Sequence, residues 1–145
     1  MMISLHSGEF LDLNIRELMI PSERVAHVQV NNNLEHALLV LTRSGYTAIP
    51  VLDPQFRLQG LISTPLIMDA ILGIERIEFE KLEEKKVEEV MNCKIPRVQI
   101  NSGLRKCLPL LIDQPFLCIE GEEGYFEGIL TRSVVLKLVN KNISS

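Results

Sequence analysis

Three consecutive residues near the C-terminus, Thr131-Arg132-Ser133, have the chemistry of an anion-binding site. They lead into a predicted helix over Ser133–Asn140, so the backbone N–H groups of a helix start lie among two hydroxyls and a guanidinium. Arg132 adds a full positive charge suited to a phosphate oxygen. The plainer alternative is a surface arginine, although the helix dipole disfavours a cation at that end. We therefore take Arg132 as the strongest single candidate for ligand binding.

Residues typical of catalytic or metal sites are scattered along the chain. The histidines, His6, His27 and His36, are distant in sequence from the cysteines, and no two of these residues have metal-ligand spacing. No nucleophile-elbow or phosphate-loop pattern occurs. Cys107 and Cys118 stand in apolar surroundings, where buried thiols are usually inert. The sequence therefore predicts neither a catalytic nor a metal site, and a thiol or metal enzyme is disfavoured.

The composition is typical of one compact acidic domain. Its 145 residues, 46% of them hydrophobic, can bury a core without a disulfide or a metal. A net charge of −4 and a pI near 5.4 argue against nucleic acid, because binding a duplex requires a cationic face. Asp69 and Asp113 interrupt the long apolar stretches, and no basic-then-apolar leader is present, so we expect neither a membrane span nor a secretory signal. The sparse cysteines suit a reducing cytoplasm, where we expect the protein to reside.

Three segments of the sequence occur twice, in the same order. The matched pairs are Ile15–Met19 with Val87–Met91, His27–Asn31 with Arg97–Asn101, and Gly60–Ser63 with Gly128–Thr131. The copies lie about 70 residues apart, a spacing too long for a solenoid of small repeats and too short for two independent domains. The sequence therefore predicts two half-modules that share one core.

In the first copy, turn and cap residues divide the chain into short elements. Asn14 is placed to cap a helical turn that Pro21 closes. The elements that follow are a strand over Val25–Val30, a helix over Leu34–Ser44 ended by Gly45, strands over Tyr46–Leu52 and Leu58–Ser63, and a helix opened by Thr64-Pro65. The predicted order is β-α-β-β-α.

The second copy repeats this order with less regular signals. Its predicted elements are strands over Val98–Ile100, Phe116–Ile119 and Phe126–Leu130, and helices over Leu104–Ile112 and Ser133–Asn140. Pro109 lies inside the first of these helices and is expected to kink it or shift its start. Between the copies, the charge-dense stretch Glu75–Glu89 is expected to form a solvated linker helix.

Two β-α-β-β-α copies, each with Gly-apolar-apolar-Ser/Thr before its last helix, resemble a tandem pair of CBS domains, the Bateman module. The tracts His27–Leu38, Gly45–Pro54 and Glu75–Leu82 are closer still to small stand-alone CBS-pair proteins of Bacillus-type bacteria. The implied fold class is α+β, with the two repeats packed as a pseudo-two-fold pair. The implied organisation is an N-terminal segment 1–14, CBS repeat 1 at 15–73, a linker helix at 74–86, CBS repeat 2 at 87–141 and a tail at 142–145.

Those CBS-pair proteins are receptors for cyclic di-AMP, so the resemblance implies a non-enzymatic second-messenger sensor. The implied partners are a second copy of the chain, forming a homodimer, and a protein such as a Rel-type alarmone synthetase or pyruvate carboxylase. In CBS pairs, a nucleotide cleft takes two strand edges from one copy and the Ser/Thr helix start from the other. The candidate ligand-binding residues are therefore Arg24, Val25, Ala26, His27, Val28, Tyr46, Thr47, Ala48, Ile49, Pro50, Thr131, Arg132 and Ser133.

The residue types at these positions suit an adenine ring beside a phosphodiester. Adenine needs a flat apolar slot with backbone hydrogen bonds at its edge, and the small side chain of Ala26 leaves room for the base. Taken singly, each apolar candidate is more typical of a core residue, and only their joint placement favours a pocket. His27 is as compatible with solvent as with a cleft, and packing is the default role for Tyr46.

The reciprocal cleft, from Ile95–Ile100, Phe116–Glu120 and Ser63-Thr64-Pro65, is chemically poorer. Pro65 removes a donor from the helix start, no arginine stands there, and Glu120 would repel phosphate. We therefore expect one working cleft per chain.

The chain departs from many nucleotide-binding CBS copies at one position in each repeat. They place an aspartate three residues after the Ser/Thr to hold a ribose diol, whereas this chain has Leu66 and Val134. The difference argues against free AMP, ADP or ATP and fits a cyclic dinucleotide, whose 3′ oxygen is esterified. It fits a lost site equally well. The alternatives are therefore a CBS regulator that binds AMP or ATP, and a ligand-free dimeric adaptor.

Overall fold

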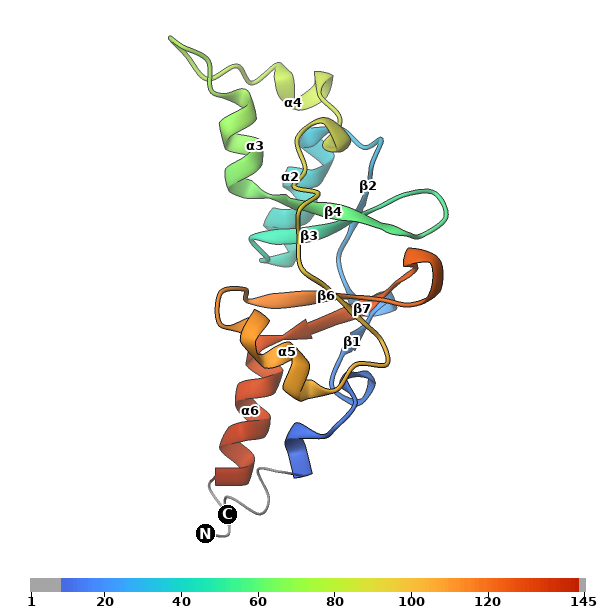
Figure 1. The fold of residues 1–145 in the computed structure, drawn as a ribbon. Helices are drawn as coiled ribbons and strands as arrows, with labels where there is room; N and C mark the ends of the chain where they lie inside the picture. The colour runs from blue at the N-terminus through green and yellow to red at the C-terminus, as the bar shows by residue number, and fades with distance from the viewer. Residues whose placement is uncertain (1–8, 144–145) are drawn as a thin grey trace. The chain divides into compact units, whose positions relative to one another are not determined.

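The computed structural model describes residues 9–143, whose helices and strands follow the order that the repeat predicts (Figure 1). The helices are α2 (Leu34–Ser44), α3 (Thr64–Ile71), α4 (Lys81–Glu84), α5 (Leu104–Leu111) and α6 (Arg132–Ile143). The strands are β1 (Ile20–Pro21), β2 (Val28–Gln29), β3 (Ala48–Leu52), β4 (Leu58–Ser63), β5 (Arg97–Gln99), β6 (Phe116–Glu120) and β7 (Phe126–Thr131). Residues 1–8 and 144–145, and with them His6 and the ends of the predicted N-terminal segment and tail, lie outside the described residues.

Local caps set the helix boundaries where the sequence predicts them. Helix α2 begins after Asn33, whose side chain accepts a hydrogen bond from the His36 N–H at 2.9 Å. It ends at Gly45, which adopts the left-handed conformation (φ 79°) and donates to the Leu41 carbonyl at 3.0 Å. Asn14 likewise accepts from the Arg16 N–H at 2.8 Å, although the turn that it caps is a single 3₁₀ turn, Ile15–Glu17.

The repeat is confirmed in the pairing of the strands. In one sheet, β2 runs parallel to β3, which pairs antiparallel with β4; in the other, β5, β6 and β7 are joined in the same way. Val28 faces Val51 in the first sheet, as Val98 faces Ile119 in the second. The register shifts immediately after Val51 and immediately after Ile119. Equivalent positions therefore pair identically in the two copies.

Two elements are much shorter than the sequence predicts, and a third tests whether Pro109 shifts the start of its helix. The strand predicted over Val25–Val30 is reduced to β2, because Val25 closes the preceding turn by donating to the Ser22 carbonyl at 3.1 Å. The predicted linker helix is limited to α4, since Gly73 donates to the Arg76 carbonyl at 2.8 Å and turns the chain before it. Helix α5 begins at Leu104 as predicted and contains Pro109, so the proline does not shift its start.

The chain forms two compact units that do not follow sequence order. Among the described residues, one unit consists of 9–25, 96–122 and 126–143, and the other of 26–95 and 123–125. In the first unit β1 pairs with β7, with Ile20 opposite Ile129. In the second, Asn92 bridges Leu61 at the equivalent place. The sheet of each repeat is therefore extended by the N-terminal part of the other repeat. The repeat boundaries stay a prediction.

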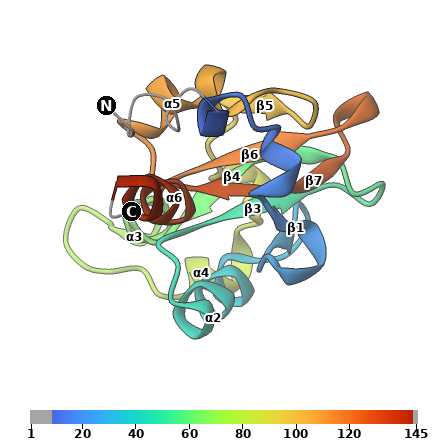
Figure 2. The ribbon, with the colours of Figure 1, turned by 90° about the horizontal axis from the view of Figure 1, so that it is seen from below.

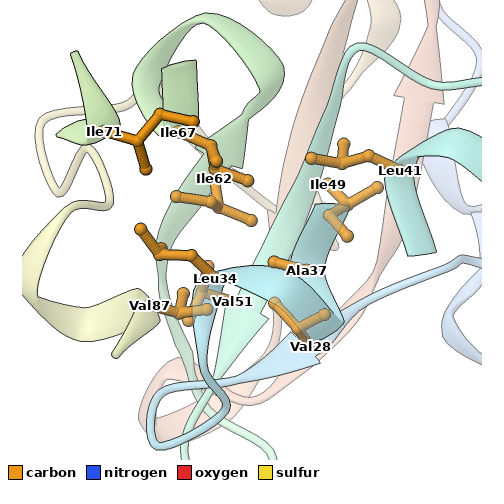
Figure 3. Close-up of a cluster of buried hydrophobic side chains, with 10 residues drawn as sticks. All are labelled: Val28, Leu34, Ala37, Leu41, Ile49, Val51, Ile62, Ile67, Ile71 and Val87. Atoms are coloured by element: carbon orange, nitrogen blue, oxygen red, sulfur yellow. The ribbon is translucent and has the colours of Figure 1, made fainter. Parts of the chain in front are cut away.

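Each unit contains its own hydrophobic core, whereas the sequence analysis expected one shared core. Figure 3 shows the core of the second unit, which is built from Val28, Leu34, Ala37, Leu41, Ile49, Val51, Ile62, Ile67, Ile71 and Val87. The other core contains Ile15, Val98, Leu104, Cys107, Leu111, Leu117, Ile119, Leu130 and Val135. The exchanged segments supply Val87 to one core and Ile15 to the other, and both side chains are fully buried. The cores are separate because each sheet buries its own helix-facing side.

In the first unit, β7 runs directly into α6, which Figure 2 shows nearly end-on. This junction places Thr131, Arg132 and Ser133 at the boundary between a buried strand and a helix start. None of the helices within residues 9–143 is both long enough and apolar enough to cross a membrane.

Candidate functional site

The predicted site residues fall into two groups, one in each unit. Strands β2 and β3 of the second unit position Ala26, His27, Val28, Tyr46, Thr47, Ala48, Ile49 and Pro50, and the first unit holds Arg24, Val25, Thr131, Arg132 and Ser133. Within the second unit the structure brings the two strand segments side by side, because β2 and β3 are hydrogen-bonded neighbours.

Burial separates the strand residues into core and accessible positions. Val28 and Ile49 are buried members of the hydrophobic core, which is the alternative role that the sequence analysis gave them. Ala26, His27 and Ala48 are half-buried, and Thr47 is exposed. The Thr47 carbonyl accepts from the Thr64 N–H at 3.1 Å. The accessible part of this group is therefore Ala26, His27 and the segment Tyr46–Ala48.

Arg132 is held in place by the C-terminal end of α5, the helix that precedes it in the sequence. Its Nε donates to the Leu111 carbonyl at 2.9 Å and its Nη2 to the Ile112 carbonyl at 3.2 Å. These oxygens are the last carbonyls of α5, where a cation is favoured by the helix dipole. The sequence analysis treated the position as unfavourable because it considered α6 alone. The guanidinium is therefore both charged and preorganised by two hydrogen bonds.

The neighbours of Arg132 complete a capped helix start. The Thr131 hydroxyl accepts from the Val134 N–H at 3.1 Å, and the Arg132 N–H donates to the Pro115 carbonyl at 2.9 Å. The Thr131 hydroxyl and the Arg132 N–H, which the sequence analysis took as anion-binding groups, thus already have hydrogen-bond partners within the fold. Ser133 is exposed. Arg132 and Ser133 are consequently the side chains of this group best suited to meet a ligand.

An open groove of about 400 Å³ lies beside Arg132 in the first unit. Its lining is apolar apart from that guanidinium and consists of Leu108, Leu111, Ile112, Arg132, Val135 and Leu136. Ile112 and Leu136 are exposed by 76% and 58%. Such a surface is better suited to an apolar side chain than to a phosphodiester.

The strand edge predicted for the poorer cleft contains an ion pair that the sequence analysis missed. Arg97 on β5 and Glu120 on β6 approach to 3.4 Å between Nη1 and Oε2. The two strands are parallel neighbours, and the predicted β-α-β order is the sequence signal for this proximity. The charge of Glu120 is therefore partly compensated.

Aromatic residues form a second feature that the sequence analysis missed. The rings of His27 and Phe56 meet edge to face, with centroids 5.4 Å apart and planes at 83°. Phe56 in turn lies 5.3 Å from Tyr125, measured between ring centroids. All three residues belong to the second unit. His27, which the sequence analysis proposed as a ligand-binding residue, thus contacts the ring of Phe56 in the hairpin between β3 and β4.

The cysteines have the environment of core side chains. Burial raises the pKa of the Cys118 thiol to about 12 and also raises the pKa of Cys107. Both thiols are therefore neutral and weakly nucleophilic near pH 7. Cys93 is exposed. Among residues 9–143, no three His, Cys, Asp or Glu side chains gather as metal ligands would.

Comparison with known proteins identifies a matching domain family and a similar protein that aligns with nearly the whole chain. The family model of the CBS domain matches residues 15–73. Cyclic di-AMP receptor B of Bacillus subtilis (strain 168) is 58% identical over 144 residues, which cover 99% of this chain and 98% of that protein.

Two crystal structures of similar proteins have the same fold. A CBS domain-containing protein of unknown function from Bacillus anthracis is 59% identical, with a TM-score of 0.86 over 93% of this chain and 98% of that one. The CbpB protein of Listeria monocytogenes, in complex with c-di-AMP, is 53% identical, with a TM-score of 0.85 over 91% of this chain and 98% of that one.

Proposed function

This chain belongs to the family of CBS-domain proteins that includes cyclic di-AMP receptor B, and on that basis we propose that it is itself a cyclic di-AMP receptor without catalytic activity. The observation that carries the proposal is the 58% identity to that receptor, which extends over 99% of the chain. Support comes from the similar Listeria monocytogenes protein whose structure was solved with c-di-AMP.

We assign the phosphodiester of the ligand to Arg132 and Ser133, with Thr131 shaping the helix start that presents them. The guanidinium is charged and its orientation is fixed by the two α5 carbonyls, so little side-chain entropy is lost on binding. We assign the adenine to the segments Arg24–Val28 and Tyr46–Pro50. There, half-buried Ala26 and Ala48 offer small apolar side chains beside backbone groups.

We propose that linear adenine nucleotides bind more weakly than the cyclic dinucleotide. Leu66 and Val134 occupy the positions at which a diol-binding carboxylate would stand, and both contribute backbone N–H groups to local helix caps. A linear nucleotide with a free ribose diol therefore finds no carboxylate to bind that diol. A cyclic 3′,5′-linked ligand does not need such a carboxylate.

The receptor would act through other proteins as a cytoplasmic homodimer. Large apolar side chains are exposed on four helices, including Leu39 on α2, Met68 on α3, Leu110 on α5 and Leu136 on α6, and exposed apolar surface favours association. Ligand state would change the affinity for a partner such as a Rel-type alarmone synthetase or pyruvate carboxylase. Equal partner affinity with and without cyclic di-AMP would contradict this coupling.

Isothermal titration of the purified protein tests the ligand directly. We expect saturable binding of cyclic di-AMP with about one ligand per chain, and much weaker or no binding of AMP, ATP and cyclic di-GMP. Preferential binding of AMP or ATP would instead identify a linear-nucleotide regulator. No heat and no thermal stabilisation with any of these nucleotides would contradict the receptor function and favour a ligand-free adaptor.

A further inference from the structure

Phe56 has a backbone conformation that is unusual for a bulky side chain. Its φ is 65°, and within residues 9–143 Glu123 is the other non-glycine residue with positive φ. An aromatic residue in this region is strained, and such strain persists only where the surrounding structure enforces it.

Asp53 enforces the conformation of the turn. One carboxylate oxygen accepts from the Gln55 and Arg57 N–H groups, each at 2.9 Å, and the other accepts from Arg57 Nε at 2.9 Å. The Phe56 N–H donates to the Asp53 carbonyl, also at 2.9 Å. Although desolvation acts to raise it, hydrogen bonds from Arg57 and Gln55 hold the pKa of Asp53 below its usual value. The turn is therefore locked from both sides of Phe56.

The second repeat shows that the turn itself does not require an aromatic side chain. Gly124 occupies the position equivalent to Phe56 and has a similar φ of 80°. A glycine adopts this conformation without strain. The first repeat instead retains a phenylalanine, whose ring contacts His27 and Tyr125. An aromatic side chain at this positive-φ position thus distinguishes the first hairpin, while the second hairpin has a further positive-φ residue in Glu123.

We infer that Phe56 is a positioning residue that fixes the imidazole of His27 for contact with the base of the bound cyclic dinucleotide. His27 is half-buried immediately before β2, and its ring meets the Phe56 ring edge to face. An imidazole held in one orientation contacts a flat base with less entropy loss than a mobile one. This role rests on the proposed receptor function. It adds a residue of the β3–β4 hairpin to those that determine the affinity for the cyclic dinucleotide.

The test is a double-mutant cycle on cyclic di-AMP affinity, using Phe56→Gly, His27→Ala and the double variant. Because an edge-to-face pair contributes modestly, we expect Phe56→Gly to weaken binding about two- to tenfold. In the His27→Ala background the same change should have almost no further effect. Phe56→Tyr, which keeps the ring, should bind cyclic di-AMP with the affinity of the unmutated protein.

A matched control exists in the other repeat. Glu123→Gly relieves the same kind of backbone strain in the equivalent hairpin without removing an aromatic ring, and should leave affinity unchanged. Phe56→Asn provides a second ring-free variant, because asparagine tolerates positive φ. Melting temperatures measured in parallel should confirm that Phe56→Gly and Phe56→Asn remain folded, with shifts below about 4 °C.

Two results would overturn the inference. One is unchanged cyclic di-AMP affinity in folded Phe56→Gly or Phe56→Asn, and the other is an equal loss with and without His27. Both are measured against the unmutated protein in the same titration, so they are distinct from a failure of that protein to bind cyclic di-AMP, which would contradict the receptor function itself.

Discussion

Arg132 belongs to one helix and stabilises another. It is the first residue of α6, yet its guanidinium caps the C-terminal carbonyls of α5 at Leu111 and Ile112. A cation is unfavourable at the first position and favourable at the second. A ligand phosphate near this group would thus meet a charge whose orientation the protein already fixes, and we expect a substitution there to alter stability as well as binding.

Two substitutions separate these contributions. Arg132→Ala removes the charge and the α5 cap, so we expect a loss of about 1 kcal/mol in the free energy of unfolding and a large loss of cyclic di-AMP affinity. Arg132→Gln keeps amide donors but removes the charge. It should retain more of the stability while still losing about tenfold or more in affinity, because charge-assisted hydrogen bonds to phosphate are the stronger kind. Thermal melting and calorimetric titration measure the two effects, and natural affinity in Arg132→Gln would contradict the phosphate role.

The Gly-apolar-apolar-Ser/Thr motif has a structural cause in strand packing. A Cβ atom on Gly60 would lie 2.6 Å from the Asn92 carbonyl oxygen, and one on Gly128 would collide with the Ile20 carbonyl oxygen. Both carbonyls belong to the segments exchanged between the repeats. The glycine of the motif therefore allows the exchanged segment to approach the sheet closely.

Gly60→Ala and Gly128→Ala are expected to destabilise the protein by about 1–3 kcal/mol each, since backbone atoms must shift to admit the methyl group. Chemical denaturation measures this change. Gly103→Ser is the control, because a Cβ there would lie 3.8 Å from the Leu13 carbonyl oxygen, in ordinary contact, and serine is a good residue at that N-cap. Stability that is unaffected in both alanine variants would show that the close approach is not required.

Segment exchange makes the units of the fold different from the units of the sequence. Val87 completes the core that contains β2, β3 and β4, although it lies in the segment matching Ile15 of the first copy. Ile15 in turn lies in the core built around β5, β6 and β7. A fragment cut at the repeat boundaries therefore loses a fully buried side chain and an edge pairing.

Two fragments test whether the folding units correspond to the repeats of the sequence or to the compact units of the structure. The fragment 26–95 keeps Val87 and the Leu61–Asn92 bridge, whereas the fragment 15–73 has neither. We expect 26–95 to show the more cooperative thermal unfolding by circular dichroism, because 15–73 lacks both a fully buried valine of this core and the edge pairing of the sheet. Higher cooperativity or a higher melting temperature for 15–73 would contradict the exchange.

The sequence determined the features that depend on local signals. Asn33 and Gly45 fix both ends of α2, because capping is a short-range interaction, and the repeated segments predict equal topology in the two copies. The two groups of candidate site residues also followed from the sequence, through the resemblance to CBS pairs. Their roles stay predictions that the binding experiments test.

Only the tertiary structure decided which segments complete each sheet and what the candidate residues contact. The exchange of Ile15 and Val87, the capping of α5 by Arg132 and the ring contact between His27 and Phe56 all join residues far apart in the chain. No local propensity encodes such pairs, because long-range contacts depend on which buried surfaces fit together once the sheets have formed.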